Sequence, residues 1–237
     1  PPMARAIMTQ PLESSRSLHD LSELLAAAGY QEVVNFSFTD AAWETDFAAA
    51  SAPIRLLNPI ASQYSVMRST LIGGLVANVQ YNLNRQAERV RVFEVGRVYR
   101  RRTDIADGPL AVKGIDQPIH VAGIAYGQSV EEQWGTPKRF VDFFDVKNDI
   151  APLFQGATPT FASGRHPAMH PGRCASIAID GAIVGWVGEL HPRLAQKYDL
   201  PRSPVVFEIE AAPLLVRPIP AFEAVSKLPA VIRDQAF

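Results

Sequence analysis

Three side chains that could bind a metal ion recur at four-residue intervals in the segment RHPAMHPGRC. They are His166, His170 and Cys174, and each is of a type that Zn²⁺ accepts as a ligand. However, Pro167 and Pro171 interrupt the helix that would align them, and a structural zinc site normally needs four ligands. The pattern therefore favours a loop approaching a strand, with Cys174 as a small buried residue. A zinc site, or a nucleophilic Cys174 beside His170, is the alternative.

One carboxylate falls on a strand face that is otherwise apolar. From residue 90 the sequence alternates with a period of two, which places Glu94 on one face with Val92 and Val98. A buried carboxylate is costly unless it is paired. Glu94 is therefore expected to pair with a nearby arginine in a structural network, and a functional role is the alternative.

The most basic run of the chain follows the same strand, and it consists of Arg97, Arg100, Arg101 and Arg102. Such a run could contact RNA phosphates or a carboxylate-rich partner. No aromatic stacking platform accompanies it, which favours a solvated strand end whose charge deters edge pairing. Neither GxGxxG nor GxxxxGK[ST] occurs, so the sequence offers no glycine-rich phosphate loop.

The elements that position these residues centre on one helix and one strand. Apolar residues at helical spacing predict a helix over 69–85, with Ser69 or Thr70 as its cap, and the alternating run predicts a strand over 90–99. An earlier helix, over 14–29, opens at Ser14 or Ser15, and Gly29 ends it. Its leucine face is either core or a surface that packs across a subunit boundary, and core is favoured; the residues are Leu18, Leu21, Leu24 and Leu25.

The remaining signals predict a mostly antiparallel sheet with helices packed against it, an α+β fold. Two alternating runs flank Asp180 and Gly181, a pair typical of a type I′ hairpin turn. Further strands are expected over 32–38, with Val34, Phe36 and Phe38 on one side, and over 54–57, 120–126 and 205–209. Further helices are expected from a cap at Thr39 or Asp40 to Phe47, over 141–154 and over 191–198. A loop rich in Gly, Asp and Pro is expected from 100 to about 118.

Composition sets the wider limits. The 237 residues are 47% hydrophobic and 20% charged, with a formal net charge of −1, so no overall basic bias marks a stand-alone nucleic-acid binder. There is one cysteine, no apolar stretch long enough to span a bilayer and no signal-peptide pattern, which predicts a cytoplasmic protein without membrane contact. The first two prolines and the unfinished final strand suggest a piece of a larger protein.

Several phrases resemble the bacterial phenylalanyl-tRNA synthetase beta chain. They are VMRSTLIGGLVANVQYNLNR, RVFEVGRVY, GYQEVVNFSF, LLNPI, HPGRCASI and GWVGELHP, and together they span nearly the whole chain in the family's order. The resemblance implies a class II synthetase-like antiparallel sheet over 14–217. It also implies a lead-in from a preceding module over 1–13. SKLPAVIRDQAF, with Pro229, Arg233 and Asp234, is similar to the start of an anticodon-binding domain, which places a linker and its truncated beginning at 218–237.

The same resemblance implies a role in assembly. The family's enzyme is an (αβ)2 assembly whose alpha chain activates phenylalanine with ATP and Mg²⁺ and charges tRNA(Phe). The module similar to this chain is catalytic in fold only and packs against the alpha chain, with the leucine-faced helix as its interface helix. No cofactor is expected in this chain itself, because FEVGRVYR lacks the Arg-x-Glu order of the class II ATP motif and GWVGELHPRLAQKY lacks the later glycine pattern. A catalytically competent class II domain and an independent RNA-binding module are the alternatives.

Overall fold

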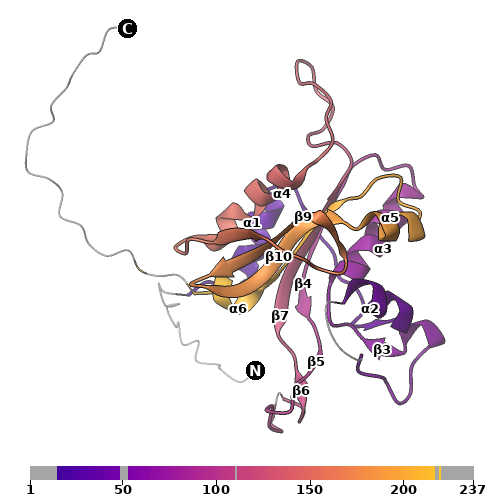
Figure 1. Ribbon diagram of the computed structural model, residues 1–237, viewed down its shortest axis with the longest axis vertical. Coiled ribbons are helices and arrows are strands. Elements are labelled where there is room, and N and C mark those ends of the chain that lie inside the picture. The colour runs from indigo at the N-terminus through magenta and orange to yellow at the C-terminus, as the bar shows by residue number, and fades with distance from the viewer. Residues whose placement is uncertain (1–14, 49–52, 110, 217–218, 220–237) are drawn as a thin grey trace, which may run out of the picture.

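The computed structural model describes residues 15–48, 53–109, 111–216 and 219, and Figure 1 shows their arrangement. The helices are α1 (Leu18–Ala27), α2 (Ala41–Phe47), α3 (Ile72–Leu83), α4 (Phe143–Ile150), α5 (Pro192–Lys197) and α6 (Ala211–Leu214), with 3-10 helices η1 (Ser62–Tyr64) and η2 (Ala151–Phe154). The strands are β1 (Gln31–Glu32), β2 (Phe38–Thr39), β3 (Val66–Met67), β4 (Val90–Arg97), β5 (Arg100–Arg101), β6 (Ile115–Asp116), β7 (Ile119–Tyr126), β8 (Thr160–Ser163), β9 (Met169–Ile179), β10 (Ala182–Leu190) and β11 (Val205–Glu210).

A seven-stranded sheet with the order β1-β4-β7-β11-β10-β9-β8 forms the centre of the fold. Its neighbours pair antiparallel except β1 and β4, which are parallel. Strands β2 and β3 form a separate small pair, as do β5 and β6. The α+β prediction, with a mostly antiparallel sheet flanked by helices, is confirmed.

Helices cover both faces of the sheet, and the strands supply apolar residues to each side in alternation. Helices α2, α3 and α5 lie on one side and α1, α4 and α6 on the other, as Figure 1 shows. In β11, Val206 belongs to the core under α3, whereas Val205 and Phe207 belong to the core under α1 and α4. Phe207 lies directly over Gly123 of β7, where a Cβ atom would come within 2.5 Å of its ring. A larger residue at 123 would therefore displace the ring.

Signals that depend on adjacent residues are confirmed. Asp180 and Gly181 both have positive φ, as a type I′ turn requires, and they join β9 to β10. Gly29, with φ of 84°, follows α1 as its terminator. The side chain of Asp40 accepts a hydrogen bond from the N–H of Ala42 at the start of α2. The strand expected over 120–126 and the short helix after His191 are also present.

Other expected boundaries are wrong. Helix α1 begins at Leu18 rather than near Ser15, because Ser17 and Asp20 form a reciprocal capping box there. The strand expected over 32–38 exists only at its ends, as part of β1 and β2, and the strand expected over 54–57 is a single bridge between Arg55 and Val66. The helix expected over 69–85 runs from Ile72 to Leu83.

Two further expectations are corrected in detail. The helix expected over 141–154 is α4 followed by the 3-10 turn η2, which contains Pro152. The loop expected between 100 and about 118 contains the β5–β6 pair. The expected lead-in over 1–13 and the unfinished element SKLPAVIRDQAF lie outside the described residues. Within the described residues, no helix is both long and apolar enough to cross a membrane.

Candidate functional site

Two buried ion pairs occupy the α3 side of the sheet. In the first, Nη1 of Arg68 lies 2.7 Å from Oε1 of Glu94, and both side chains are almost completely buried. The side-chain amide of Asn35 donates to the second oxygen of Glu94 at 2.8 Å. Nε of Arg68 donates to the carbonyl of Arg97 at 3.0 Å. The prediction that Glu94 pairs with an arginine in a structural network is therefore confirmed, with Arg68 as the partner.

The second pair joins β7 to β11. Nδ1 of His120 lies 2.8 Å from Oε1 of Glu208, and both groups are buried. The hydroxyl of Thr70 and the N–H of Leu71 also donate to Glu208, so this carboxylate anchors the start of α3. Burial alone would raise the pKa of Glu208, but the hydrogen bonds and the charge of His120 hold it below its usual value.

A third buried carboxylate lacks a cationic partner. Glu44 of α2 is 3% exposed, and its Oε1 atom accepts hydrogen bonds from the N–H and hydroxyl of Ser69. The described residues place no Lys, Arg or His within ion-pair distance of it. Burial accordingly raises the pKa of Glu44, although Ser69 partly offsets this effect.

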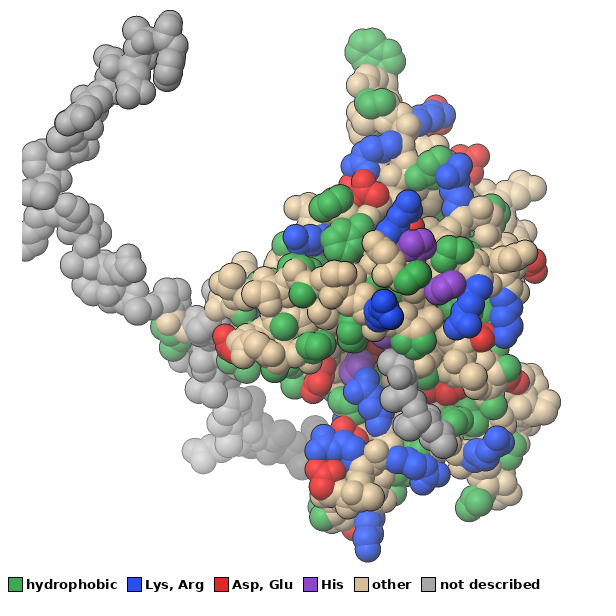
Figure 2. Space-filling model, viewed as in Figure 1, with side chains coloured by type: hydrophobic (Ala, Val, Ile, Leu, Met, Phe, Trp, Pro, Cys, Tyr) green, Lys and Arg blue, Asp and Glu red, His purple; other side chains and the backbone are tan. Residues whose placement is uncertain are grey.

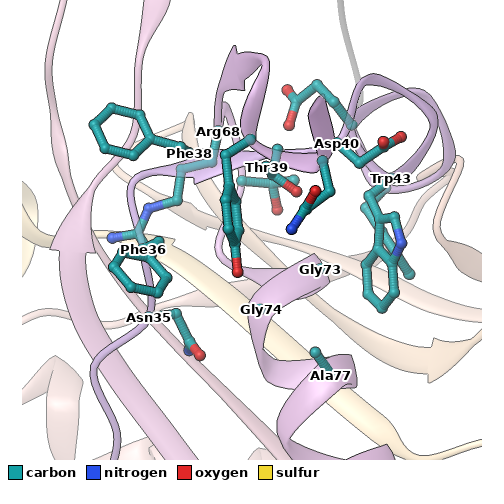
Figure 3. A pocket seen from close by; sticks show the side chains of 15 residues that line it. Asn35, Phe36, Phe38, Thr39, Asp40, Trp43, Arg68, Gly73, Gly74 and Ala77 are labelled. Carbon is teal, nitrogen blue, oxygen red and sulfur yellow. The ribbon is translucent and has the colours of Figure 1, made fainter. Parts of the chain in front are cut away.

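Glu44 lines a pocket of about 300 Å³, which we call the aromatic pocket and which Figure 3 shows from close by. Its walls come from α2, from the segment before β2 and from the first turns of α3, where Gly73 and Gly74 leave room beside the helix. The rings that line it are those of Phe36, Phe38, Trp43, Phe47 and Tyr64.

A second hollow, of about 390 Å³, extends from Thr70 to the separate strand β5, and we call it the basic pocket. Its lining includes Arg100, Arg101 and Arg102 together with His120 and His166. Figure 2 shows Lys and Arg side chains gathered near this end of the visible face, close to the β5–β6 pair of Figure 1.

The arginine run lies only partly at the basic pocket. Arg97 is exposed and donates to the carbonyl of Gln117 instead of lining the basic pocket. Arg102 forms ion pairs with Asp104 and Asp116, which neutralise much of its charge. The contact of this run with RNA or with a partner stays a prediction.

The sequence RHPAMHPGRC does not gather its three candidate ligands. The Nδ1 atoms of His166 and His170 each accept a hydrogen bond from a backbone N–H two residues later, and Cys174 is buried beside Met169. Strand β9 begins at Met169, so His170 and Cys174 both lie on it. Among the described residues, no group of three or more His, Cys, Asp or Glu side chains is arranged to hold a metal ion.

The leucine face of α1 divides into two pairs. Leu21 and Leu25 are fully buried in the core of this chain, so neither keeps any surface for a partner. This burial agrees with the favoured core interpretation of the leucine face. Leu18 and Leu24 are only partly buried beside the same core, and their interface role stays a prediction.

An exposed apolar surface escaped the sequence reasoning. Val34 is 91% exposed, Leu57 97% and Ile60 85%, and the ring of Phe36 extends from the same region to Tyr64, 5.4 Å between ring centroids. The alternation of Val34, Phe36 and Phe38 predicted one side of a strand, yet the chain leaves the sheet after β1. Large apolar residues exposed to this extent in two segments that the Phe36–Tyr64 contact joins are typical of an interaction surface. We call Val34, Phe36, Leu57 and Ile60 the apolar rim.

Replacing Glu44 by glutamine should stabilise the fold near neutral pH, by about 1–3 kcal/mol. A carboxyl whose pKa is raised by folding favours the folded state while it is protonated, and it loses that contribution as pH rises through the folded-state pKa. The gain in Glu44→Gln should therefore shrink as pH falls toward 4.5, the ordinary value for the group. Urea unfolding between pH 4 and pH 8 measures this, and a gain that does not vary with pH would contradict it.

Comparisons with known proteins agree with one another. The model of the phenylalanyl tRNA synthetase beta chain CLM domain matches residues 1–211. Curated proteins named phenylalanine–tRNA ligase beta subunit are 55% identical in Ralstonia nicotianae and in Burkholderia pseudomallei, over 236 residues. The same subunit in Bordetella bronchiseptica is 53% identical over 238 residues. These matches cover all of this chain but only 29–30% of each relative.

A solved structure extends the comparison to the fold. PylSc of Desulfitobacterium hafniense, a pyrrolysyl tRNA synthetase, superposes with a TM-score of 0.55 at 14% identity and covers 84% of this chain and 65% of that chain. At that identity the likeness concerns the fold alone, which is the class II synthetase-like sheet described above. With a family model that spans most of its length and relatives above 50% identity, the chain belongs to the family of the phenylalanyl tRNA synthetase beta chain CLM domain.

Proposed function

We propose that this chain is a non-catalytic, class II synthetase-like module of a phenylalanine–tRNA ligase beta subunit that docks against the alpha chain. In this role it supports an (αβ)2 assembly that charges tRNA(Phe) in the cytoplasm, with ATP and Mg²⁺ used by the whole enzyme. The observation that carries the proposal is the apolar rim, since leaving Val34, Leu57 and Ile60 in water is unfavourable unless another surface covers them.

The pairing of the buried charged groups also favours a non-catalytic role. Arg68 and Glu94 neutralise each other, and His120 is engaged by Glu208, so these groups are occupied in holding the fold. Activation of an amino acid with ATP needs cations placed against a triphosphate. Arg102, a cation at the rim of the basic pocket, is already paired with aspartates.

The test mixes this chain with an alpha chain and measures the mass of the complex by size exclusion coupled to light scattering. Val34→Asp with Leu57→Asp should weaken the complex at least about thirtyfold, because charges would enter an apolar contact. Both residues are exposed, so the variant should keep the fold of the parent chain by circular dichroism. Trp134→Asp is the matched control, as Trp134 is equally exposed but lies in the segment between β7 and α4.

Unchanged assembly of the double variant would contradict docking through the apolar rim. Loss of assembly in Trp134→Asp alone would move the contact to the segment between β7 and α4.

A second function is favoured by one observation, the exposed Arg100 and Arg101 at the basic pocket beside His120. Two cations at a hollow of this size suit a phosphate-bearing ligand, either a nucleotide or RNA. Phenylalanine-dependent ATP–pyrophosphate exchange by this chain alone would favour a catalytic domain. Filter binding of tRNA that weakens steeply with salt would favour an RNA-binding module.

A further inference from the structure

The aromatic pocket contains a negative charge that the described part of the chain does not neutralise. Oε1 of Glu44 is satisfied by Ser69, whereas Oε2 has no hydrogen-bond partner among the described residues. Among the described residues, the fully buried side-chain nitrogen and oxygen atoms without a hydrogen-bond partner are Nε of Arg89 and Nε of Arg91. Because Oε2 of Glu44 lacks a partner but is not among them, this oxygen keeps some accessible surface, and Glu44 lines the pocket.

The other charges at the pocket leave it anionic. Arg68 also lines it, but its charge is balanced by Glu94 at 2.7 Å. Asp40 lines it too and has no ion-pair partner among the described residues; its side chain accepts the N–H of Ala42. With Arg68 paired, Glu44 and Asp40 are the charged residues of the lining that have no ion-pair partner among the described residues, and Arg100 acts on Glu44 only from beyond ion-pair distance.

The walls suit a cation that carries an apolar body. Aromatic faces bear the negative part of the ring quadrupole and attract ammonium and guanidinium groups, more strongly where water is excluded. Figure 3 shows Phe36 and Phe38 on one side of the hollow and Trp43 on the other, with Gly73 and Gly74 of α3 beneath. A volume of about 300 Å³ is at the small end of the range for small-molecule sites.

We propose that the aromatic pocket binds an organic cation, an ammonium or guanidinium group attached to an apolar body, with Glu44 as its counter-ion. The aromatic side chains enclose the apolar body of the ligand, and the carboxylate of Asp40 adds to the attraction for its cation. Burial raises the pKa of the Glu44 carboxyl, and a cation bound beside it would lower that pKa again.

This cation has two possible sources. One is a free small amine. The other is a basic side chain of a docked protein, since Phe36 belongs both to the pocket and to the apolar rim. The second source rests on the proposed function, whereas the pocket chemistry itself does not.

The first experiment uses this chain alone and benzylammonium as the probe. Benzyl alcohol is its neutral counterpart and benzoate the anionic one. The indole N–H signal of Trp43, followed by NMR, should shift saturably with benzylammonium and far less with the other two. The indole signals of Trp134 and Trp186 serve as internal controls, because neither residue lines the pocket.

Two variants separate the proposal from a purely structural role of Glu44. Glu44→Gln keeps an oxygen for the Ser69 donors but removes the charge, and it should weaken benzylammonium binding at least about tenfold. Phe36→Leu keeps an apolar side chain at an exposed position, and it should weaken binding about two- to fivefold. Glu23→Gln is the control on the exposed side of α1, and its affinity should equal that of the parent chain.

The proposal is overturned if benzyl alcohol binds as tightly as benzylammonium, if Glu44→Gln binds the cation unchanged, or if the Trp43 signal does not respond. Adding the alpha chain then distinguishes the two sources. Displacement of bound benzylammonium on assembly assigns the site to a basic side chain of that partner. Retention of the probe in the assembled complex assigns it to a free amine. Absence of assembly, with the Trp43 shift preserved, contradicts the proposed docking but leaves the cation site standing.

Discussion

Replacing Arg68 by methionine should lower the free energy of unfolding by about 3–5 kcal/mol, because it leaves Glu94 buried without a cation. Arg68 also donates to the carbonyl of Arg97, so the contact between the segment before α3 and the end of β4 is lost as well. Urea unfolding at pH 7, followed by circular dichroism, measures the change. The slope of the transition should stay that of the parent chain if both states keep their compactness.

Two further variants isolate the charge effect. Arg97→Met removes an exposed arginine from β4, the strand that carries Glu94. It should lower the free energy of unfolding by less than about 0.5 kcal/mol. Combining Arg68→Met with Glu94→Gln removes both charges, and the double variant should be more stable than Arg68→Met alone. If Arg68→Met costs no more than Arg97→Met, the ion pair does not stabilise this fold.

Leu25→Ala should destabilise the chain by about 2–5 kcal/mol, since the side chain is fully buried between α1 and the sheet. Leu24→Ala is the matched control on the same helix, and its cost should be smaller because Leu24 keeps exposed surface. Chemical unfolding of the two variants side by side gives the comparison.

The same pair tests the division of the leucine face. If Leu25→Ala unfolds like the parent chain but assembles poorly with an alpha chain, then Leu25 is an interface residue after all. If Leu24→Ala keeps full stability and loses assembly, the interface prediction for α1 holds at Leu24.

The sequence predicted best those features that are encoded by neighbouring residues. The Asp180–Gly181 turn needs positive φ at two adjacent positions, and the end of α1 needs one glycine. The strand expected over 32–38 is interrupted in the segment where the Asn35 amide donates to Glu94, 59 residues further along the chain. Alternating apolar residues then mark an exposed surface, which periodicity cannot distinguish from a buried one.

The candidate site shows the same division. An unusual carboxylate in an apolar strand was visible in the sequence, and so was the need for an arginine to pair with it. That the arginine would be Arg68, and not one of the run that begins at Arg97, depends on how the segment before α3 crosses β4. Glu44 gave no signal at all, because a glutamate in a short amphipathic helix is ordinarily exposed.

The position of β11 bears on how the chain is synthesised. This strand, residues 205–210, lies between β7 and β10, which precede it in the sequence. Until β11 has emerged from the ribosome, the sheet consists of two separate halves. One half ends at β7 and the other at β10, and each of these two strands has an unpaired edge. Unpaired edges are sites of aggregation, and closing such distant segments is slow compared with local folding. The nascent chain therefore depends on β11, the last strand among the described residues, to pair with both edges.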